Sequence, residues 1–184
     1  MHQPADPVPG SPPAGPPYVV GPTTNRLSHR ALEPSDAEAF FRLNSDPAVM
    51  EHTGEPPLGS VEAARAAIES YPDFASVGYG RWGCFSRESG ELIGFCGLKY
   101  LADLDVVDVG YRLFPAFWGR GLATEACAAS VAFGFEVLGL KRIVAFVLPA
   151  NPGSMAVLAK CGFVSDGPVQ LDGLSVEHWS IEAG

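Results

Sequence analysis

The 184 residues are enough for one domain with a sizeable core, and 47% hydrophobic and 18% charged residues are typical of a soluble globular protein. The net charge of −9 argues against nonspecific nucleic-acid binding, which needs a basic face, and favours a cationic partner such as an amine or a basic peptide. The longest apolar stretch, residues 126–138, is too short to span a bilayer, and the N-terminus lacks the pattern of a signal peptide.

The four cysteines, Cys84, Cys96, Cys127 and Cys161, are far apart in the sequence, with no C-x-x-C pair and no histidine nearby. This spacing indicates buried free thiols in a reducing compartment, not disulfides or a metal site. We therefore expect a cytoplasmic protein without a bound metal and without a nucleic-acid or membrane partner. A monomer and a homodimer are both compatible with this composition.

The first 22 residues differ in composition from the rest of the chain. They hold eight of the 17 prolines, almost no charge and few large apolar side chains. Such a segment cannot bury enough apolar surface to offset the entropy of ordering it. The sequence therefore predicts a disordered, proline-rich leader over residues 1–22, followed by one domain over residues 23–184.

The predicted domain opens with a short strand near residues 27–32. The residues Ser35-Asp36-Ala37-Glu38, after a proline, have the pattern of a capping box and predict a helix. The apolar side chains expected on the buried face of this helix are Ala39, Phe40 and Leu43.

Two short helices and a meander of strands are predicted next. Asp46-Pro47 starts a helical turn that ends at Met50, and Ser60 can cap a helix that ends near residue 70. The pattern then changes to strands. The strand-like runs, separated by short turn-rich loops typical of antiparallel neighbours, are residues 79–86, 91–100 and 106–114.

The most informative segment follows, and it reads Phe117-Trp118-Gly119-Arg120-Gly121-Leu122-Ala123-Thr124-Glu125-Ala126. Its two glycines lack the Cβ atoms that would keep a ligand away from the backbone. A helix predicted over residues 122–138 begins directly after them, and its first N–H groups have no partner within the helix. The segment therefore predicts an anion cradle for a nucleotide or a pyrophosphate-bearing cofactor, with a tight turn for chain reversal as the alternative. It is neither a Walker loop nor a dinucleotide fingerprint.

The rest of the chain completes a mixed sheet. The helix over 122–138 is apolar on nearly all sides, which predicts burial against a sheet, and Gly139 ends it. A strand over 142–148 follows, then a helix that Asn151-Pro152 starts and Gly162 ends, then a hairpin of residues 163–167 and 175–181. We predict an α/β fold: a mixed, mostly antiparallel sheet with a parallel β-α-β cofactor-binding core and helices on both faces.

Four further motifs accompany the 117–126 segment in a fixed order. They are Asp46-Pro47-Ala48-Val49-Met50, Val107-Asp108-Val109-Gly110-Tyr111-Arg112-Leu113, Asn151-x-x-Ser154 and Lys160-Cys161-Gly162-Phe163. Together they resemble a GNAT-fold N-acetyltransferase over roughly residues 24–182. More closely, they resemble the RimJ/RimL-like branch, the acetyltransferases of ribosomal-protein N-termini and their relatives.

The resemblance implies an enzyme that binds acetyl-CoA and transfers acetyl directly, in a ternary complex, to a primary amine on a protein N-terminus or a small molecule. In the family, the pyrophosphate lies on backbone amides of a Gln/Arg-x-x-Gly-x-Gly/Ala loop, which here begins at Trp118. The splayed strand, here ending at 111–114, pairs with the pantetheine arm as a peptide adds to a sheet edge. The implied cofactor-binding residues are Leu113, Phe114, Trp118, Gly119, Arg120, Gly121, Leu122, Ala123, Thr124, Asn151 and Ser154.

Two residues are candidates for the chemistry. The resemblance makes Ser154 the donor of a proton to the departing thiolate, while the alternative is a first-turn helix residue that only bonds Asn151. Many family members use a tyrosine farther along this helix, where this chain has Leu158. Asp108 is the candidate general base, and the alternative is a solvated carboxylate on a half-exposed strand face.

The remaining candidates have structural interpretations. Asn151 caps its helix and can also bond the pantetheine amide, and Glu125 is favoured by the dipole of its helix. The residues expected on the surface or partly buried are His29, His52 and His178, with a substrate contact as the alternative for His52. The tryptophans, expected to be packing residues, are Trp82, Trp118 and Trp179.

A second function remains open. The missing family tyrosine is compatible with a non-catalytic GNAT-like module that binds an acyl-CoA without turnover. Release of a free thiol in the presence of amines distinguishes the enzyme from the module.

Overall fold

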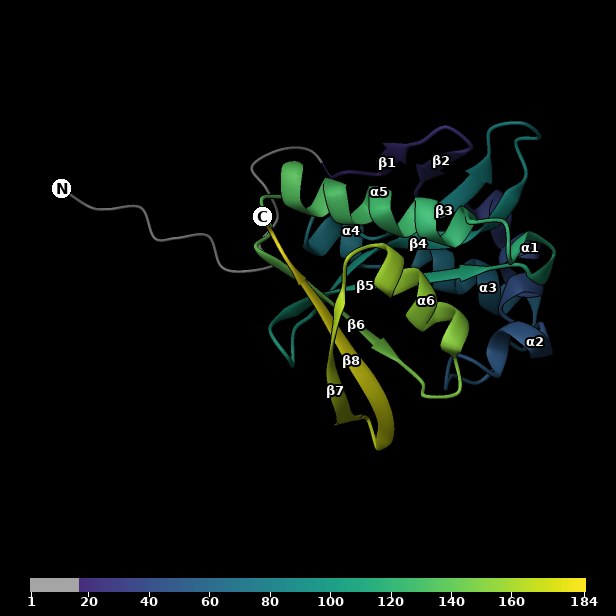
Figure 1. Cartoon of the computed structure of the whole chain (residues 1–184). Helices are drawn as coiled ribbons and strands as arrows, with labels where there is room; N and C mark the ends of the chain where they lie inside the picture. Colours follow the sequence, from purple (N-terminus) through teal and green to yellow (C-terminus); the bar gives the residue numbers. More distant parts are fainter. Residues whose placement is uncertain (1–16) are drawn as a thin grey trace.

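Eight strands pair into one open sheet in the computed structural model, which describes residues 17–184. Their order across the sheet is β1-β2-β3-β4-β5-β6-β8-β7 (Figure 1). The strands are β1 (Val20–Thr23), β2 (Leu27–Arg30), β3 (Arg81–Ser86), β4 (Leu92–Leu101), β5 (Val106–Leu113), β6 (Arg142–Val147), β7 (Val164–Leu171) and β8 (Leu174–Glu182). The helices are α1 (Ala37–Leu43), α2 (Pro47–Met50), α3 (Val61–Glu69), α4 (Asp73–Ser76), α5 (Leu122–Glu136) and α6 (Pro152–Lys160), with 3₁₀ turns η1 (Pro34–Asp36) and η2 (Pro115–Phe117).

The sheet consists of two antiparallel parts joined by one parallel contact. Strands β1 to β5 form the first part, and β6, β8 and β7 form the second. Between them, β5 runs parallel to β6 and pairs with it at Asp108 and Val144. The predicted meander, closing hairpin and mixed sheet are therefore confirmed.

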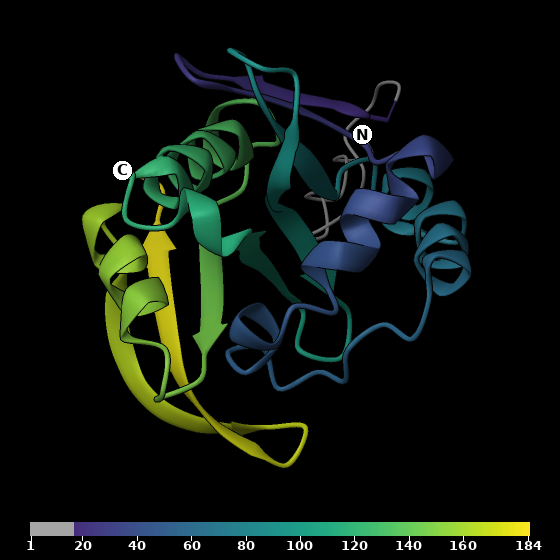
Figure 2. The ribbon, with the colours of Figure 1, turned by 90° about the vertical axis from the view of Figure 1, so that its right-hand side faces the viewer.

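Side-chain alternation along β5 sends successive residues to opposite faces of the sheet. Val107, Val109 and Leu113 pack in the clusters that contain α5 residues. Asp108, Gly110 and Arg112 lie on the other face, where α1 to α4 are found. Figure 2 shows the two groups of helices on either side of the sheet, α5 and α6 on one and the N-terminal helices on the other. The predicted coverage of both faces is confirmed.

Three of the helices begin where local capping chemistry predicts. The side chains of Asp46, Ser60 and Asn151 accept hydrogen bonds from the N–H groups of Ala48, Ala63 and Ser154 at 2.9, 3.1 and 3.0 Å. Each bond satisfies one of the N–H groups that have no partner within the helix. These caps fix the starts of α2, α3 and α6.

The start of α1 differs from the prediction. The turn η1 precedes the helix, and the Asp36 carboxylate accepts from the N–H of Glu33 at 2.8 Å and pairs with Arg30 at 2.8 Å. The predicted capping box over residues 35–38 is therefore wrong, because Asp36 closes the turn that comes before the helix. The residues that α1 buries are Ala37 and Leu43, while Ala39 and Phe40 are half-buried. Helix α4 was not predicted.

The interior is apolar, and the cysteines contribute to it. Cys84, Cys96 and Cys127 are buried and Cys161 is half-buried, all as free thiols. The expected burial therefore holds for three of the four cysteines. Within residues 17–184, no helix combines the length and the apolar character that crossing a membrane would require.

The predicted boundary of the leader at residue 22 falls inside strand β1. Residues 1–16 lie outside the described part of the chain, but residues 17–22 pack on the domain. The Trp82 indole N–H donates to the Tyr18 carbonyl at 2.8 Å, and the Tyr18 ring meets Phe133 edge-on at 5.3 Å. A Cβ on Gly21 would lie 2.7 Å from the Trp82 ring, so the missing side chain allows β1 to cross the indole. Composition alone did not indicate this docking.

The contact between Tyr18 and the core gives a testable prediction. We expect Tyr18→Ala to lower the free energy of unfolding by about 1–3 kcal/mol, because it removes an edge-to-face contact and part of the cover over Trp82. Urea unfolding measures this loss. Val20→Ala is the matched control, since Val20 lies two residues along the chain from Tyr18, at the start of β1, and is 68% exposed. Equal stability of the two variants would contradict the docking of β1.

Candidate functional site

Beyond Asp108 and Val144, β5 and β6 diverge and leave a cleft of about 1080 Å³. Residues 109–113 of β5 form one wall, and residues 145–148 with the first turns of α6 form the other. The loop that precedes α5 lines one end. A strand edge that has lost its neighbour carries backbone N–H and C=O groups that need partners. The cleft can therefore take an extended ligand with amide groups of its own.

The loop before α5 has the geometry of an anion cradle. Gly119 and Gly121 have φ angles of +70° and +75°, which glycine adopts without strain. Gly121 is the N-cap of α5, a helix of 15 residues, and no side chain in the described part of the chain caps it. The first N–H groups of α5 are thus available to a ligand with the positive end of the helix dipole behind them.

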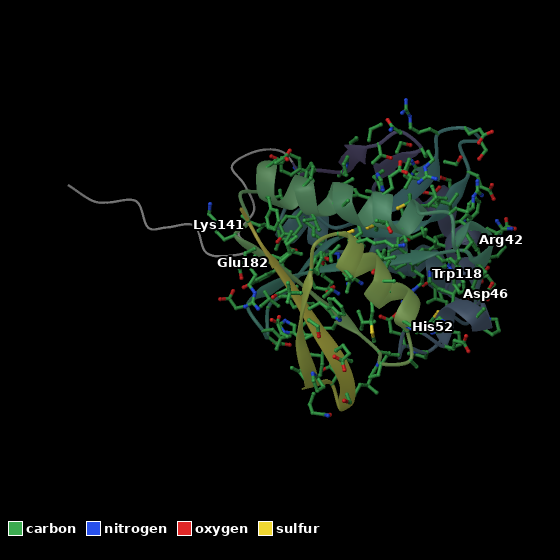
Figure 3. All side chains as sticks on the ribbon, viewed as in Figure 1. Arg42, Asp46, His52, Trp118, Lys141 and Glu182 are labelled. Carbon is green, nitrogen blue, oxygen red and sulfur yellow. The ribbon has the colours of Figure 1, made fainter. Side chains whose placement is uncertain are left out.

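Trp118 lies at the mouth of this cleft. Its ring is 44% exposed, and its indole N–H donates to the Leu113 carbonyl at 2.7 Å. The His52 ring lies 6.2 Å from it, and Figure 3 shows both residues at the same end of the molecule. The expectation that Trp118 is a packing residue is not met, because Trp118 is among the exposed large hydrophobic residues of the described chain.

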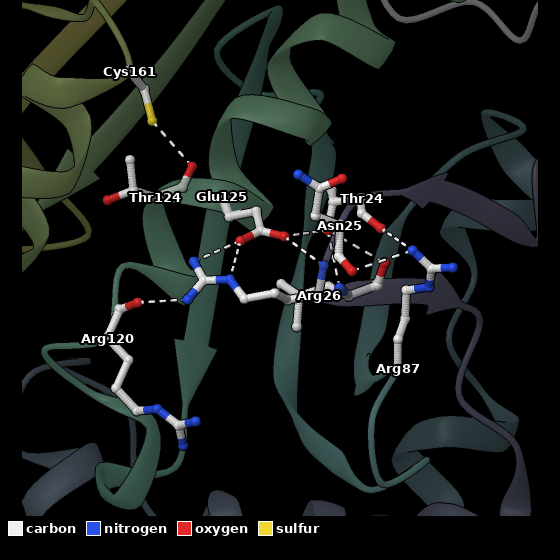
Figure 4. Close-up of polar contacts among 9 residues, drawn as sticks. Thr24, Asn25, Arg26, Arg87, Arg120, Thr124, Glu125 and Cys161 are labelled. Atoms are coloured by element: carbon white, nitrogen blue, oxygen red, sulfur yellow. Dashed lines mark hydrogen bonds and ion pairs between the residues drawn. The ribbon is translucent and has the colours of Figure 1, made fainter.

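Glu125, in the first turn of α5, anchors the loop to the N-terminal part of the domain. It accepts from the hydroxyl of Thr24 at 2.6 Å and from the backbone N–H of Arg26 at 2.9 Å, and it pairs with the Arg26 guanidinium at 2.6 Å. The same guanidinium donates to the Arg120 carbonyl at 2.9 Å (Figure 4). Burial opposes the charge of Glu125, but these hydrogen bonds outweigh it and lower the pKa of Glu125. The predicted structural role of Glu125 is therefore extended: its network holds the loop.

Ser154 lies on α6, where the cleft meets the face covered by α5. Its Oγ is 2.8 Å from the hydroxyl oxygen of Tyr111, which also donates to the Ser154 carbonyl at 3.0 Å. Burial raises the pKa of Tyr111, so this residue keeps its proton at neutral pH. Leu158, at the family's tyrosine position, is fully buried. Tyr111 thus brings a phenol to Ser154 from the strand instead of from the helix.

The alternative interpretation of Asp108, a solvated carboxylate on a half-exposed strand face, is wrong. Asp108 is 6% exposed, and its carboxylate pairs with the Arg81 guanidinium at 2.5 Å. Burial raises the pKa of Asp108, and the charges of Arg81 and Lys99 offset only part of the shift. The carboxylate lies where β5 and β6 separate.

The histidines and the other tryptophans have mixed outcomes. His29 is buried, and its Nδ1 lies 2.6 Å from the Pro22 carbonyl, while His178 stacks on Phe146 and pairs with Asp166 at 3.2 Å. His52 is half-buried and lines the cleft. Trp82 is buried and Trp179 half-buried, as expected of packing residues.

Most of the predicted binding residues line the cleft. They are Leu113, Trp118, Gly119, Gly121, Leu122, Ala123, Thr124, Asn151 and Ser154. Phe114 instead packs with Leu43 and Phe95 on the opposite face, and the Arg120 side chain lies over Phe117. The lining residues that sequence reasoning missed are Tyr111, Arg81, Arg112 and Glu55. Charges at alternate positions of an apolar strand, Asp108 and Arg112, were a usable signal, because period two places them on one face.

Comparison with known proteins shows the family to which this chain belongs. Residues 26–164 match the family described as Acetyltransferase (GNAT) domain. A relative named uncharacterized N-acetyltransferase YoaA, from Bacillus subtilis, is 36% identical over 146 residues, which cover 78% of this chain and 82% of the relative.

Solved structures share the fold and differ in their named acceptors. RimL, described as a ribosomal α-N-protein acetyltransferase in complex with coenzyme A, superposes with a TM-score of 0.75 at 20% identity over 89% of this chain and 97% of its own. Spermidine N-acetyltransferase from Vibrio cholerae, with CoA and spermine, gives 0.70 at 23% identity over 86% of this chain and 96% of its own. At these identities the likeness concerns the fold, and it favours neither acceptor.

The Glu125 network predicts a pH-dependent stability. We expect Glu125→Gln to cost about 1–2 kcal/mol near pH 7, because it removes a charge that accepts several hydrogen bonds. The folded-state pKa is lowered from 4.5, so the contribution is present above that value and is lost as the pH falls through the folded pKa. Urea unfolding of both proteins from pH 7 to pH 3 should show the difference shrink. The exposed Glu88→Gln is the control, and a difference that is independent of pH would contradict the assignment.

Proposed function

Because this chain belongs to the GNAT acetyltransferase family, we propose that it transfers the acetyl group of acetyl-CoA to a primary amine in a ternary complex. The acceptor would be a protein N-terminus or a small-molecule amine. The observation that carries the proposal is the adjacency of two features: the cleft between the diverging strands β5 and β6, and the uncapped N-terminus of α5 beside it.

The residues present fit acetyl-CoA. The two glycines with positive φ and the first N–H groups of α5 suit a pyrophosphate, and the free edge of β5 suits the amide groups of a pantetheine arm. The cleft of about 1080 Å³ has room for such a molecule. Trp118 at the first loop position is compatible with this role, because backbone amides do the binding.

Bound acetyl-CoA supplies a thioester, whose sulfur needs a proton as it leaves. Ser154 is our proposed proton donor, since its hydroxyl lies on the cleft wall within hydrogen-bond distance of Tyr111. The Tyr111 phenol, which stays protonated because burial raises its pKa, would hold the Ser154 hydroxyl in place by this contact. This pair also weakens the argument for a non-catalytic acyl-CoA module, which rested on the missing tyrosine at position 158.

Asp108 is our proposed general base. Its carboxylate lies where the strands separate, on the face opposite to α5 and α6. The raised pKa of Asp108 brings it closer to the range in which a carboxylate takes a proton from an amine. Arg81 holds the carboxylate in place.

The finer family assignment also belongs to the proposal. The motifs at residues 46–50 and 151–154 support the RimJ/RimL-like branch. The fold likenesses to RimL and to a spermidine acetyltransferase do not distinguish a protein acceptor from a small-molecule acceptor. We further propose that the acetyltransferase domain functions in the cytoplasm, where acetyl-CoA is made.

The cofactor seat can be tested at Gly121. Acetyl-CoA should raise the melting temperature of the wild type, because a ligand that binds only the folded state stabilises it. We expect Gly121→Glu to abolish this shift, since a carboxylate would occupy the pyrophosphate seat. Gly121→Ala is the control for backbone strain: its Cβ would meet only Arg26 at 3.6 Å. A full shift in the glutamate variant would place the phosphates elsewhere.

The proton donor can be tested at Ser154. We expect Ser154→Ala to lower kcat roughly 10²-fold while the Kd for acetyl-CoA stays near the wild-type value. Tyr111→Phe should lower kcat by less, because Ser154 would keep its own hydroxyl. Ser165→Ala on β7 controls for removal of a hydroxyl far from the cleft. If Ser154→Ala keeps its full turnover, the residue has only a structural role.

A further inference from the structure

A second cavity opens from the cleft on the face that carries α1 and α3. It has a volume of about 220 Å³ and shares Glu55, Arg81, Phe95 and Arg112 with the cleft. Its apolar walls are Leu32, Phe40, Ile68, Tyr71, Phe74 and Phe95. An apolar or aromatic group of modest size suits these walls.

Arg81 lines both the cleft and the cavity, and one of its buried nitrogens has no hydrogen-bond partner among residues 17–184. Its guanidinium lies over Gly110, where a Cβ would be 2.5 Å from Cζ, so this glycine makes room for it. One Nη bonds to Asp108, but the buried Nε–H has no partner among residues 17–184. A buried donor without a partner carries a free-energy cost that a ligand oxygen can remove.

Arg112 carries a charge that is poorly compensated. Its side chain is only 11% exposed, and burial lowers the pKa of Arg112. One Nη donates to the neutral amide of Asn44, and the other pairs at 3.0 Å with Glu55, whose side chain is 60% exposed. An exposed, solvent-screened carboxylate on a loop compensates a buried guanidinium weakly and can be displaced.

The local charge is opposite in sign to that of the whole chain. The cleft is lined by four basic residues, Arg81, Lys99, Arg112 and Lys160, and three acidic ones, Glu55, Asp108 and Asp172, a net of one positive charge, whereas the whole chain carries −9. Such a lining repels a polyamine and attracts an anionic group. The amine of the acceptor must still reach Asp108, next to Arg81.

We propose that the acceptor is an α-amino acid with an apolar or aromatic side chain. Its carboxylate binds Arg112 and the Nε–H of Arg81, its amine faces Asp108, and its side chain fills the cavity beside α1 and α3. This assignment rests on the proposed acetyltransferase function and names its substrate class. A peptide N-terminus lacks the adjacent carboxylate, and a polyamine lacks any.

The main comparison is between amino acids and their amides, which differ only in the carboxylate. Spermidine and a short peptide represent the other acceptor classes. Thiol release from acetyl-CoA is measured with L-phenylalanine and L-leucine, with their amides, with spermidine and with a short peptide. We expect kcat/KM for the acids to exceed that for the amides by about 10- to 100-fold, the value of a charge-assisted hydrogen bond. The amide's amine loses its proton more readily, so this difference cannot come from amine basicity.

Variants of Arg112 test whether this residue binds the carboxylate of the acceptor. Arg112→Gln should raise KM for the amino acids about 10-fold or more and should change KM for the amides by a much smaller factor. Arg112→Lys should restore part of the preference, because it keeps the charge. Arg65→Gln, on the exposed side of α3, should behave as wild type. A loss of folding in Arg112→Gln would reduce the rates with acids and amides alike, and Arg112→Lys would then carry the comparison.

Each outcome decides the inference. Equal rates with acids and amides, or a preference for spermidine or the peptide, would overturn it and leave the acetyltransferase function standing. No thiol release with any amine would instead contradict the proposed function. In that case, the melting temperature with CoA decides: a rise with L-phenylalanine but not with its amide supports the site, and no rise with either overturns it.

Discussion

The parting of β5 from β6 is the constraint on which the rest of the structure depends. After Asp108, β5 continues without a neighbour on one side, and its backbone groups there need partners that the fold does not supply. The crossover through α5 places a helix N-terminus at the same end of the gap. A ligand with amides at one end and phosphates at the other satisfies both, which is why the fold suits a coenzyme A thioester.

Strand β5 presents residues to both faces of the sheet. Tyr111 faces α6 and meets Ser154, while Asp108 and Gly110 line the cleft from the other face and Arg112 lines both the cleft and the cavity beside α1 and α3. Alternation along one strand would thus separate the proposed proton donor, held by Tyr111, from the proposed base Asp108. The Glu125 network ties the loop before α5 to the turn between β1 and β2, so the loop is held without a ligand.

Local chemistry made much of the fold predictable. The caps at Asp46, Ser60 and Asn151 and the helix stop at Gly139 depend on neighbours within a few residues, and the structure has them. Contacts between distant segments were not predictable in this way. Arg81 reaches Asp108 across 27 positions and Tyr111 reaches Ser154 across 43, and only the sheet order brings them together. Tyr18 was missed because a proline-rich composition conceals single anchoring residues.

Hydrogen exchange tests the central claim, that the free edge of β5 and the start of α5 together hold the donor. Amide exchange is measured with and without saturating acetyl-CoA. The account predicts slower exchange in residues 109–113 and 119–125, with little change in β2 and β3, because only the first two segments gain hydrogen-bond partners. Unchanged exchange in residues 109–113 and 119–125, with protection elsewhere, would contradict it.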